Sequence, residues 1–145
     1  MDALELIKTD HQRLESLFDR FRSESGRQQQ VLLFENIKQD LNSHTSMEET
    51  VFYPAFKNYP EFQEIIDRSY QEYGKVKDQL SKISALPDES PEFADKVKLL
   101  WQDVSKHLDE EENELFPMVR KLMKRAERER LGRHMQAAKE EGAAA

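Results

Sequence analysis

Histidine and glutamate recur at helical spacing in two places along the chain. His44 precedes Glu48 by four residues, and His107 precedes Glu111 by the same interval. Residues four apart lie on one face of a helix, about 6 Å apart along its axis. Imidazole nitrogens and carboxylate oxygens are donors that iron, manganese and zinc accept. Each pair could therefore bind a metal ion, although one such pair alone could equally be an ion pair on a helix surface.

The two pairs belong to an internal repeat in which equivalent histidines are 63 positions apart. Each pair is followed by a second glutamate, then by aromatic residues and a proline ten residues after the histidine, which is Pro54 in one copy and Pro117 in the other. Nearly the same offset places Asp10-His11 on Glu72-Tyr73. We therefore predict two copies of one helical hairpin, with a ring residue on the first helix and the His-x-x-x-Glu pair on the second.

Six residues of this repeat are candidate metal ligands: His11, His44, Glu48, Tyr73, His107 and Glu111. Buried carboxylates without a partner are costly and repel each other, and cations between the helices would resolve both problems. Six sulfur-free donors fit two carboxylate-bridged ions better than one zinc ion, which needs four ligands. Glu49 and Glu112 lie one residue further round the helix, where they would contact the ligands from outside or lie at the surface. The alternative is a metal-free structural bundle.

Four segments must position these donors, and in each the apolar residues recur at alternating three- and four-residue steps. They cover residues 4–21, 34–55, 62–83 and 93–122. We expect these apolar residues in the core, including Val51 and Ala55 of the second segment and Met118 and Leu122 of the fourth. Because the connections are short, we predict an all-α fold, an up-down-up-down four-helix bundle of two repeated hairpins. Pro54 and Pro117 should kink or end the second and fourth helices.

A different composition begins near the end of the fourth segment. Residues 120–133 contain seven basic and two acidic side chains. We predict a bundle over residues 1–125 and a basic C-terminal helix and tail over 126–145, in which His134 lies at the surface. This helix is expected either to be solvated or to contact a partner.

The composition excludes several classes of protein. The chain has 145 residues, of which 35% are charged, and no cysteine, so it offers no disulfide scaffold, thiol nucleophile, zinc ribbon or iron–sulfur cluster. A net charge of −7 argues against a nucleic-acid partner. No apolar run approaches the ~18 residues of a membrane span, and the first residues lack a signal-peptide pattern. We therefore expect no membrane partner and a cytoplasmic location.

His11, His44-x-x-x-Glu48 and His107-x-x-x-Glu111 together resemble the hemerythrin-like family, also called the HHE cation-binding domain, over about residues 2–123. The resemblance implies a four-helix bundle around a non-haem di-iron centre with an oxo or hydroxo bridge. It also implies that these five residues are iron ligands and that the two glutamates are bridging candidates. Iron is thereby favoured over manganese or zinc.

Tyr73 departs from the family pattern, which usually has histidine at this position, and Lys77 replaces a further histidine of the oxygen carriers. Reversible oxygen carriage is therefore not expected. A phenolate ligand favours ferric iron, by analogy with tyrosinate-ligated haem catalases. Alternatively, Tyr73 stays protonated and leaves one iron with an open position.

The expected function is thus catalase- or peroxidase-like detoxification, in which the di-iron centre reacts with peroxide, nitric oxide or O2. The alternative is an iron or oxygen sensor, or a storage module, that binds without turnover.

Overall fold

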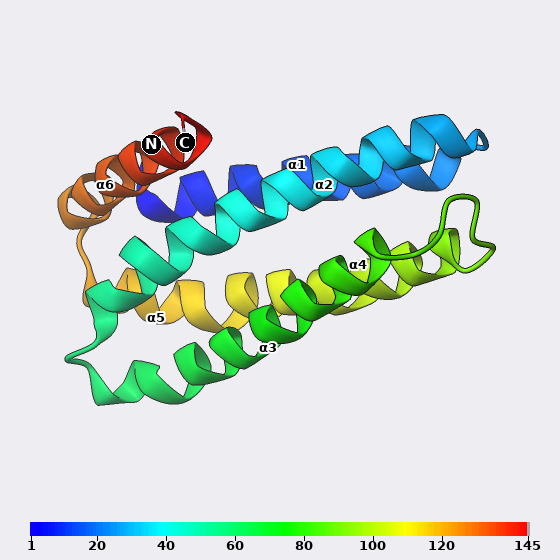
Figure 1. Cartoon of the computed structure of the whole chain (residues 1–145). Helices are drawn as coiled ribbons and strands as arrows, with labels where there is room; N and C mark the ends of the chain where they lie inside the picture. The colour runs from blue at the N-terminus through cyan, green and yellow to red at the C-terminus, as the bar shows by residue number, and fades with distance from the viewer. Residues whose placement is uncertain (145) are drawn as a thin grey trace.

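The computed structural model describes residues 1–144, and the regular elements in that range are all helical. Four long helices, α1 (Ala3–Ser23), α2 (Arg27–Met47), α3 (Pro60–Ser84) and α4 (Phe93–Glu110), form the body of the molecule. They run up, down, up and down, and the α1–α2 pair packs on the α3–α4 pair (Figure 1). The predicted all-α four-helix bundle is confirmed.

The second and fourth helices change pitch directly after the His-x-x-x-Glu pairs. The segments η1 (Glu48–Phe52) and η3 (Glu111–Leu115) are π-helical turns, which are one residue wider than α-helical turns. They are followed by a 3₁₀ turn, η2 (Tyr53–Phe56), and by a short helix, α5 (Phe116–Leu122).

Both π-turns end two residues before a proline, which has no N–H to donate and clashes with the preceding helical turn. Pro54 and Pro117 are the second residues of the elements that follow. The predicted interruption at each proline is therefore present, in the form of a widened turn rather than a chain reversal.

The π-turns shift the buried face by one residue relative to the predicted apolar stripe. Val51 and Met118 were expected in the core but are only half-buried, whereas Phe52 and Val119, one position on, are fully buried. Ala55 is likewise half-buried beside the fully buried Phe56, and Leu122, also expected in the core, is only half-buried. A regular helical period cannot account for the additional residue in each turn.

The C-terminal helix α6 (Arg125–Ala144) folds back against α1 and α2 (Figure 1). Leu131 and Met135 on its inner face are buried. Gly132 lies so close to the N-terminal backbone that a Cβ atom there would be 2.6 Å from the carbonyl oxygen of Met1. The helix is therefore docked on the bundle along one face and is not solvated on all sides.

The core consists of two apolar clusters with a layer of buried polar residues between them. One cluster, around Phe18 and Val97, lies toward the loops 24–26 and 85–92, and the other, around Phe52, includes the buried residues of α6. His134 is exposed, as predicted. Among the residues that the structure describes, no helix combines the length and apolar character that crossing a bilayer requires.

Candidate metal centre

All six predicted ligands lie in the polar layer, and each is at most 3% exposed. Each long helix or its π-turn contributes at least one of them. The donors are His11 on α1, His44 on α2, Glu48 on η1, Tyr73 on α3, His107 on α4 and Glu111 on η3. The structure thus brings together every residue that the sequence pattern singled out, while their binding of metal stays a prediction.

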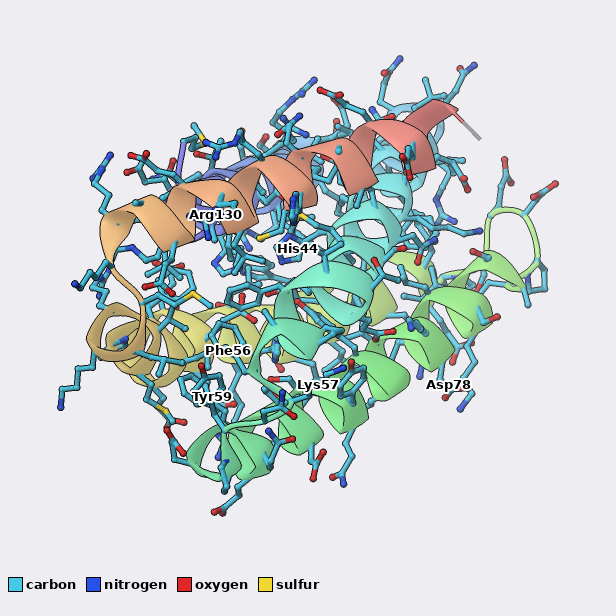
Figure 2. All side chains as sticks on the ribbon, turned by 90° about the vertical axis from the view of Figure 1, so that its left-hand side faces the viewer. His44, Phe56, Lys57, Tyr59, Asp78 and Arg130 are labelled. Atoms are coloured by element: carbon cyan, nitrogen blue, oxygen red, sulfur yellow. The ribbon has the colours of Figure 1, made fainter. Side chains whose placement is uncertain are left out.

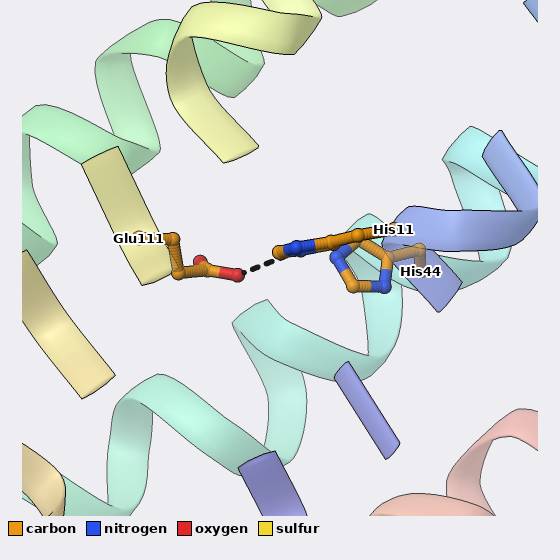
Figure 3. Close-up of side chains that lie close together, drawn as sticks. All are labelled: His11, His44 and Glu111. Carbon is orange, nitrogen blue, oxygen red and sulfur yellow. Dashed lines mark hydrogen bonds and ion pairs between the residues drawn. The ribbon is translucent and has the colours of Figure 1, made fainter. Parts of the chain in front are cut away.

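The first group, half-site A, consists of His11, His44 and Glu111. Glu111 Oε1 lies 3.1 Å from His11 Nε2, and the two imidazole rings meet edge to face at 5.2 Å (Figure 3). One donor atom from each residue lies within 4.8 Å of the others. A single metal ion could therefore contact all three.

The second group, half-site B, consists of Glu48, His107 and Glu111, with donor atoms again within 4.8 Å of one another. The Tyr73 hydroxyl donates a 2.5 Å hydrogen bond to Glu48 Oε1, and its ring centre lies 4.3 Å from that of His107. Because Glu111 belongs to both half-sites, it lies where a carboxylate could bridge two ions.

The contacts cross between the two hairpins of the repeat. His11 of the first hairpin contacts Glu111 of the second, and Tyr73 of the second contacts Glu48 of the first. Equivalent residues therefore make equivalent contacts: a ring residue of one hairpin contacts the glutamate of the other. The ring is an imidazole in one contact and a phenol in the other.

Each of the three histidines has a carboxylate at its Nδ1 atom. The pairs are Asp10 with His44 at 2.8 Å, Glu112 with His11 at 2.9 Å and Glu72 with His107 at 3.6 Å. A carboxylate in this position fixes the ring orientation and leaves Nε2 as the metal donor. Glu49, the repeat equivalent of Glu112, instead pairs with Lys77 at 3.1 Å near the surface.

Tyr53 is a site residue that the sequence analysis missed. It is 1% exposed, and its hydroxyl donates a 2.8 Å hydrogen bond to Glu111 Oε2. Its repeat equivalent is Phe116, which stacks on His11 and has no hydroxyl to offer Glu48. The signal available in the sequence was the hydroxyl-bearing Tyr53 between the candidate ligand Glu48 and Pro54.

Without a metal ion, the electrostatics of the layer are those of buried ion pairs. Burial alone would lower the pKa of His44, but the charge of Glu48 and the hydrogen bond with Asp10 raise it to about 10. For His107, burial is likewise outweighed by Glu111 and Glu72, and the pKa is about 10.

The pKa values of the two candidate ligand carboxylates shift in opposite directions. Burial raises the pKa of Glu111, but the nearby imidazoles of His107 and His11 lower it well below its usual value. Burial and the charge of Glu111 raise the pKa of Glu48. Burial and Glu48 also raise the pKa of Tyr73 well above 10. Protonated histidines therefore supply the positive charge that balances these carboxylates when no metal ion is bound.

The polar layer also contains donor atoms that the protein leaves without hydrogen bonds. Within residues 1–141, whose side chains are described, these buried atoms include His44 Nε2, His107 Nε2 and Glu48 Oε2. His44 Nε2 lies 2.9 Å from Glu48 Oε1, but not in hydrogen-bonding geometry. Buried polar atoms are rarely left unpaired. Their nitrogen and oxygen chemistry, and their convergence on Glu111, fit a pair of first-row metal ions.

Comparisons with known proteins agree with this geometry. The family described as Hemerythrin HHE cation binding domain matches residues 2–119. A solved hemerythrin HHE cation-binding-domain protein from Mycobacterium kansasii superimposes with a TM-score of 0.86 at 26% identity, over 98% of this chain and 87% of that one.

Two curated relatives are longer than this chain. A DNA nickase of Nostoc sp. is 30% identical over 142 residues, which is 96% of this chain but 39% of the nickase. An uncharacterized hemerythrin-like protein of Schizosaccharomyces pombe is 27% identical over 123 residues, 83% of this chain and 61% of that protein.

Proposed function

Because the chain belongs to the hemerythrin HHE cation-binding family, we propose that it holds a non-haem di-iron centre that reacts with peroxide, nitric oxide or dioxygen. Iron bound in the polar layer would act toward such an oxidant as a Lewis acid and as an electron donor or acceptor. The role would be detoxification of the catalase or peroxidase kind, in the cytoplasm.

The observation that carries the proposal is the pair of buried half-sites that share Glu111. Each half-site has an imidazole nitrogen without a hydrogen bond, His44 Nε2 in one and His107 Nε2 in the other. A bridging carboxylate flanked by imidazoles suits two ions better than one. The sulfur-free donors favour iron over the softer metals, and the family match favours it over manganese and zinc.

The protein's own residues would select small reactants. The two apolar clusters enclose the polar layer on both sides. A cavity of about 20 Å³ reaches His44, which is room for about one water-sized molecule. Peroxide, nitric oxide and dioxygen are of this size class, whereas an organic substrate is not.

Tyr73 is included in the proposal as a ligand of half-site B. Its phenol oxygen lies against Glu48, and its ring lies against His107. Glu48 Oε1 already accepts the phenol hydrogen bond, so it can take the proton that the phenol would release on ligation. A phenolate there would stabilise ferric iron, which suits redox chemistry better than reversible oxygen binding.

Iron analysis and peroxide turnover test this function. Protein purified after iron-replete expression should contain about two iron ions per chain and release dioxygen from peroxide, or oxidise a peroxidase dye, over many turnovers. His11→Ala should lose iron, whereas the matched control His134→Ala, on an exposed histidine, should keep it. Wild-type protein that remains metal-free under these conditions would contradict the proposal.

An iron or oxygen sensor, or a storage module, is the second candidate. The observation in its favour is that α6 packs against α1, α2 and η1 around half-site A. A structural change on metal binding could therefore be transmitted to the basic outer face of α6. A sensor would show a large change in melting temperature with iron and a single stoichiometric reaction with peroxide. We propose no nucleic-acid partner, because the net charge is −7 and the region matched in the nickase is 39% of that protein.

A further inference from the structure

Lys139 connects the C-terminal helix to half-site A. Its ammonium nitrogen Nζ lies 2.5 Å from Asp10 Oδ1, and the other oxygen of that carboxylate, Oδ2, lies 2.8 Å from His44 Nδ1. The side chains are shielded, with 16% exposure for Lys139 and 6% for Asp10. A continuous line of contacts therefore runs from α6 to a predicted metal ligand.

Asp10 uses both carboxylate oxygens in this line, one for each neighbour. Because Lys139 holds Oδ1, the Asp10 carboxylate cannot rotate freely about its Cβ–Cγ bond. Oδ2 then stays directed at Nδ1 of His44, which keeps the opposite ring nitrogen, Nε2, toward the centre. Carboxylates that hold ligand histidines in this way commonly change metal affinity by about 10- to 100-fold when removed.

The remainder of α6 is fixed so that Lys139 reaches Asp10. Arg128 Nε lies 3.3 Å from Asp2 Oδ2, and Gly132 lies directly on the N-terminal backbone. Met135, one helical turn before Lys139, is fully buried. Figure 2 shows His44 on the side of the bundle that α6 covers. Lys139 also lines the small cavity that reaches His44.

Half-site B has a weaker counterpart of this line. His107 Nδ1 lies 3.6 Å from Glu72 Oε2, and Glu72 Oε1 lies 3.7 Å from Arg68 Nε. Arg68 is 43% exposed and comes from α3, the same helix as Glu72. The additional helix thus gives half-site A a closer and better shielded support.

We propose that Lys139 is a positioning residue for the metal centre: through Asp10 it holds His44 in its ligating orientation and makes half-site A the tighter of the two. The inference rests on the proposed metal binding and assigns α6 a part in it. The rest of the helix anchors Lys139 and does not itself contact metal.

Metal titration of three variants tests this role. Metal-free wild-type protein, titrated anaerobically with Fe(II) and separately with Co(II), should bind in two phases. Lys139→Met, which keeps the length but removes the charge, should weaken the tighter phase about tenfold and leave the weaker phase unchanged. Lys139→Arg should restore most of the loss. The matched control Arg130→Met, on the same helix (Figure 2), should bind like wild type.

The outcomes separate this inference from the proposed function. If wild type binds no metal, both fail. If wild type binds about two ions and Lys139→Met binds them equally well, the inference is wrong and the di-metal function stands. A lower melting temperature of metal-free Lys139→Met with unchanged affinities would also overturn it, because Lys139 would then only stabilise the fold. Asp10→Asn is a further variant. It should weaken the tighter metal-binding phase more than Lys139→Met does and leave the weaker phase unchanged.

Discussion

The two half-sites occupy equivalent places in a duplicated hairpin, yet they differ in their candidate ring ligands and in what supports them. Half-site A has two imidazoles, and its His44 is held by Asp10 at 2.8 Å. Half-site B has one imidazole and a phenol, and its His107 lies 3.6 Å from Glu72.

In the proposed centre, this difference would let one repeated motif give two metal ions different surroundings. The repeat retains the parts that both sites need, the His-x-x-x-Glu pair and a carboxylate behind its histidine. It varies the residue that crosses to the other hairpin, His11 in one copy and Tyr73 in the other. We expect half-site A to be the tighter site and half-site B to carry the ferric, oxidant-reactive character.

Removal of the shared carboxylate should have the largest effect. Glu111→Ala takes a ligand from both half-sites and should reduce bound iron from about two ions per chain to almost none. Glu48→Ala affects half-site B alone and should leave about one. Glu64→Ala, on an exposed glutamate of α3, is the control. Equal losses in the first two variants, measured by plasma emission, would mean that Glu111 does not bridge.

Tyr73→Phe should remove the phenolate-to-iron absorption band of the ferric protein while most of the iron remains. Tyr53→Phe is the matched control, because Tyr53 is an equally buried phenol bonded to Glu111 Oε2 but is not proposed as a ligand. Visible absorption and resonance Raman spectra of both variants decide the point. A band that survives in Tyr73→Phe would show that Tyr73 stays protonated.

Gly132→Ala should disturb the docking of α6, which supports half-site A, without affecting half-site B. The added methyl group would meet the N-terminal backbone, so we expect a loss of about 1–3 kcal/mol in unfolding free energy and weaker binding at half-site A alone. Gly74→Ala, where a Cβ meets nothing within 4 Å, should instead gain about 0.5–1 kcal/mol. Urea unfolding measures both. Equal behaviour of the two variants would show that α6 does not need this close approach.

The smallest effect should be on the pH dependence of the metal-free protein. His44 and His107 have folded pKa values of about 10, above the usual ~6.5. Their stabilising contribution is therefore complete below pH ~6.5 and is lost as the pH rises toward 10. Asp10→Asn should reduce this loss more than Glu72→Gln, because the Asp10 contact is shorter. Identical pH profiles of the two variants would contradict the difference between the supports.

The sequence predicted the bundle and the grouping of all six candidate ligands, because both depend on local periodicity and on a repeat. It could not predict Tyr53 as a partner of Glu111, since that contact forms only after the hairpins pack. The one-residue shift of the buried face that each π-turn introduces was also missed. Proline signals an interruption but does not specify whether a kink, a break or a π-turn follows.

The docking of α6 was beyond the sequence argument for a different reason. Its inner face has few apolar residues, chiefly Leu131 and Met135, so its apolar pattern is weak. The contact depends instead on Gly132, which permits close approach, and on ion pairs such as Lys139 with Asp10. Ion pairs between residues distant in sequence carry no periodic signal.

Mössbauer spectroscopy of the ⁵⁷Fe-reconstituted protein tests the central claim, two unequal metal sites that share Glu111, most directly. We expect about two irons per chain in two quadrupole doublets of equal area. Tyr73→Phe should change only one doublet, and Lys139→Met should deplete the other. A single doublet that responds to both substitutions, or a spectrum of one iron per chain, would contradict it.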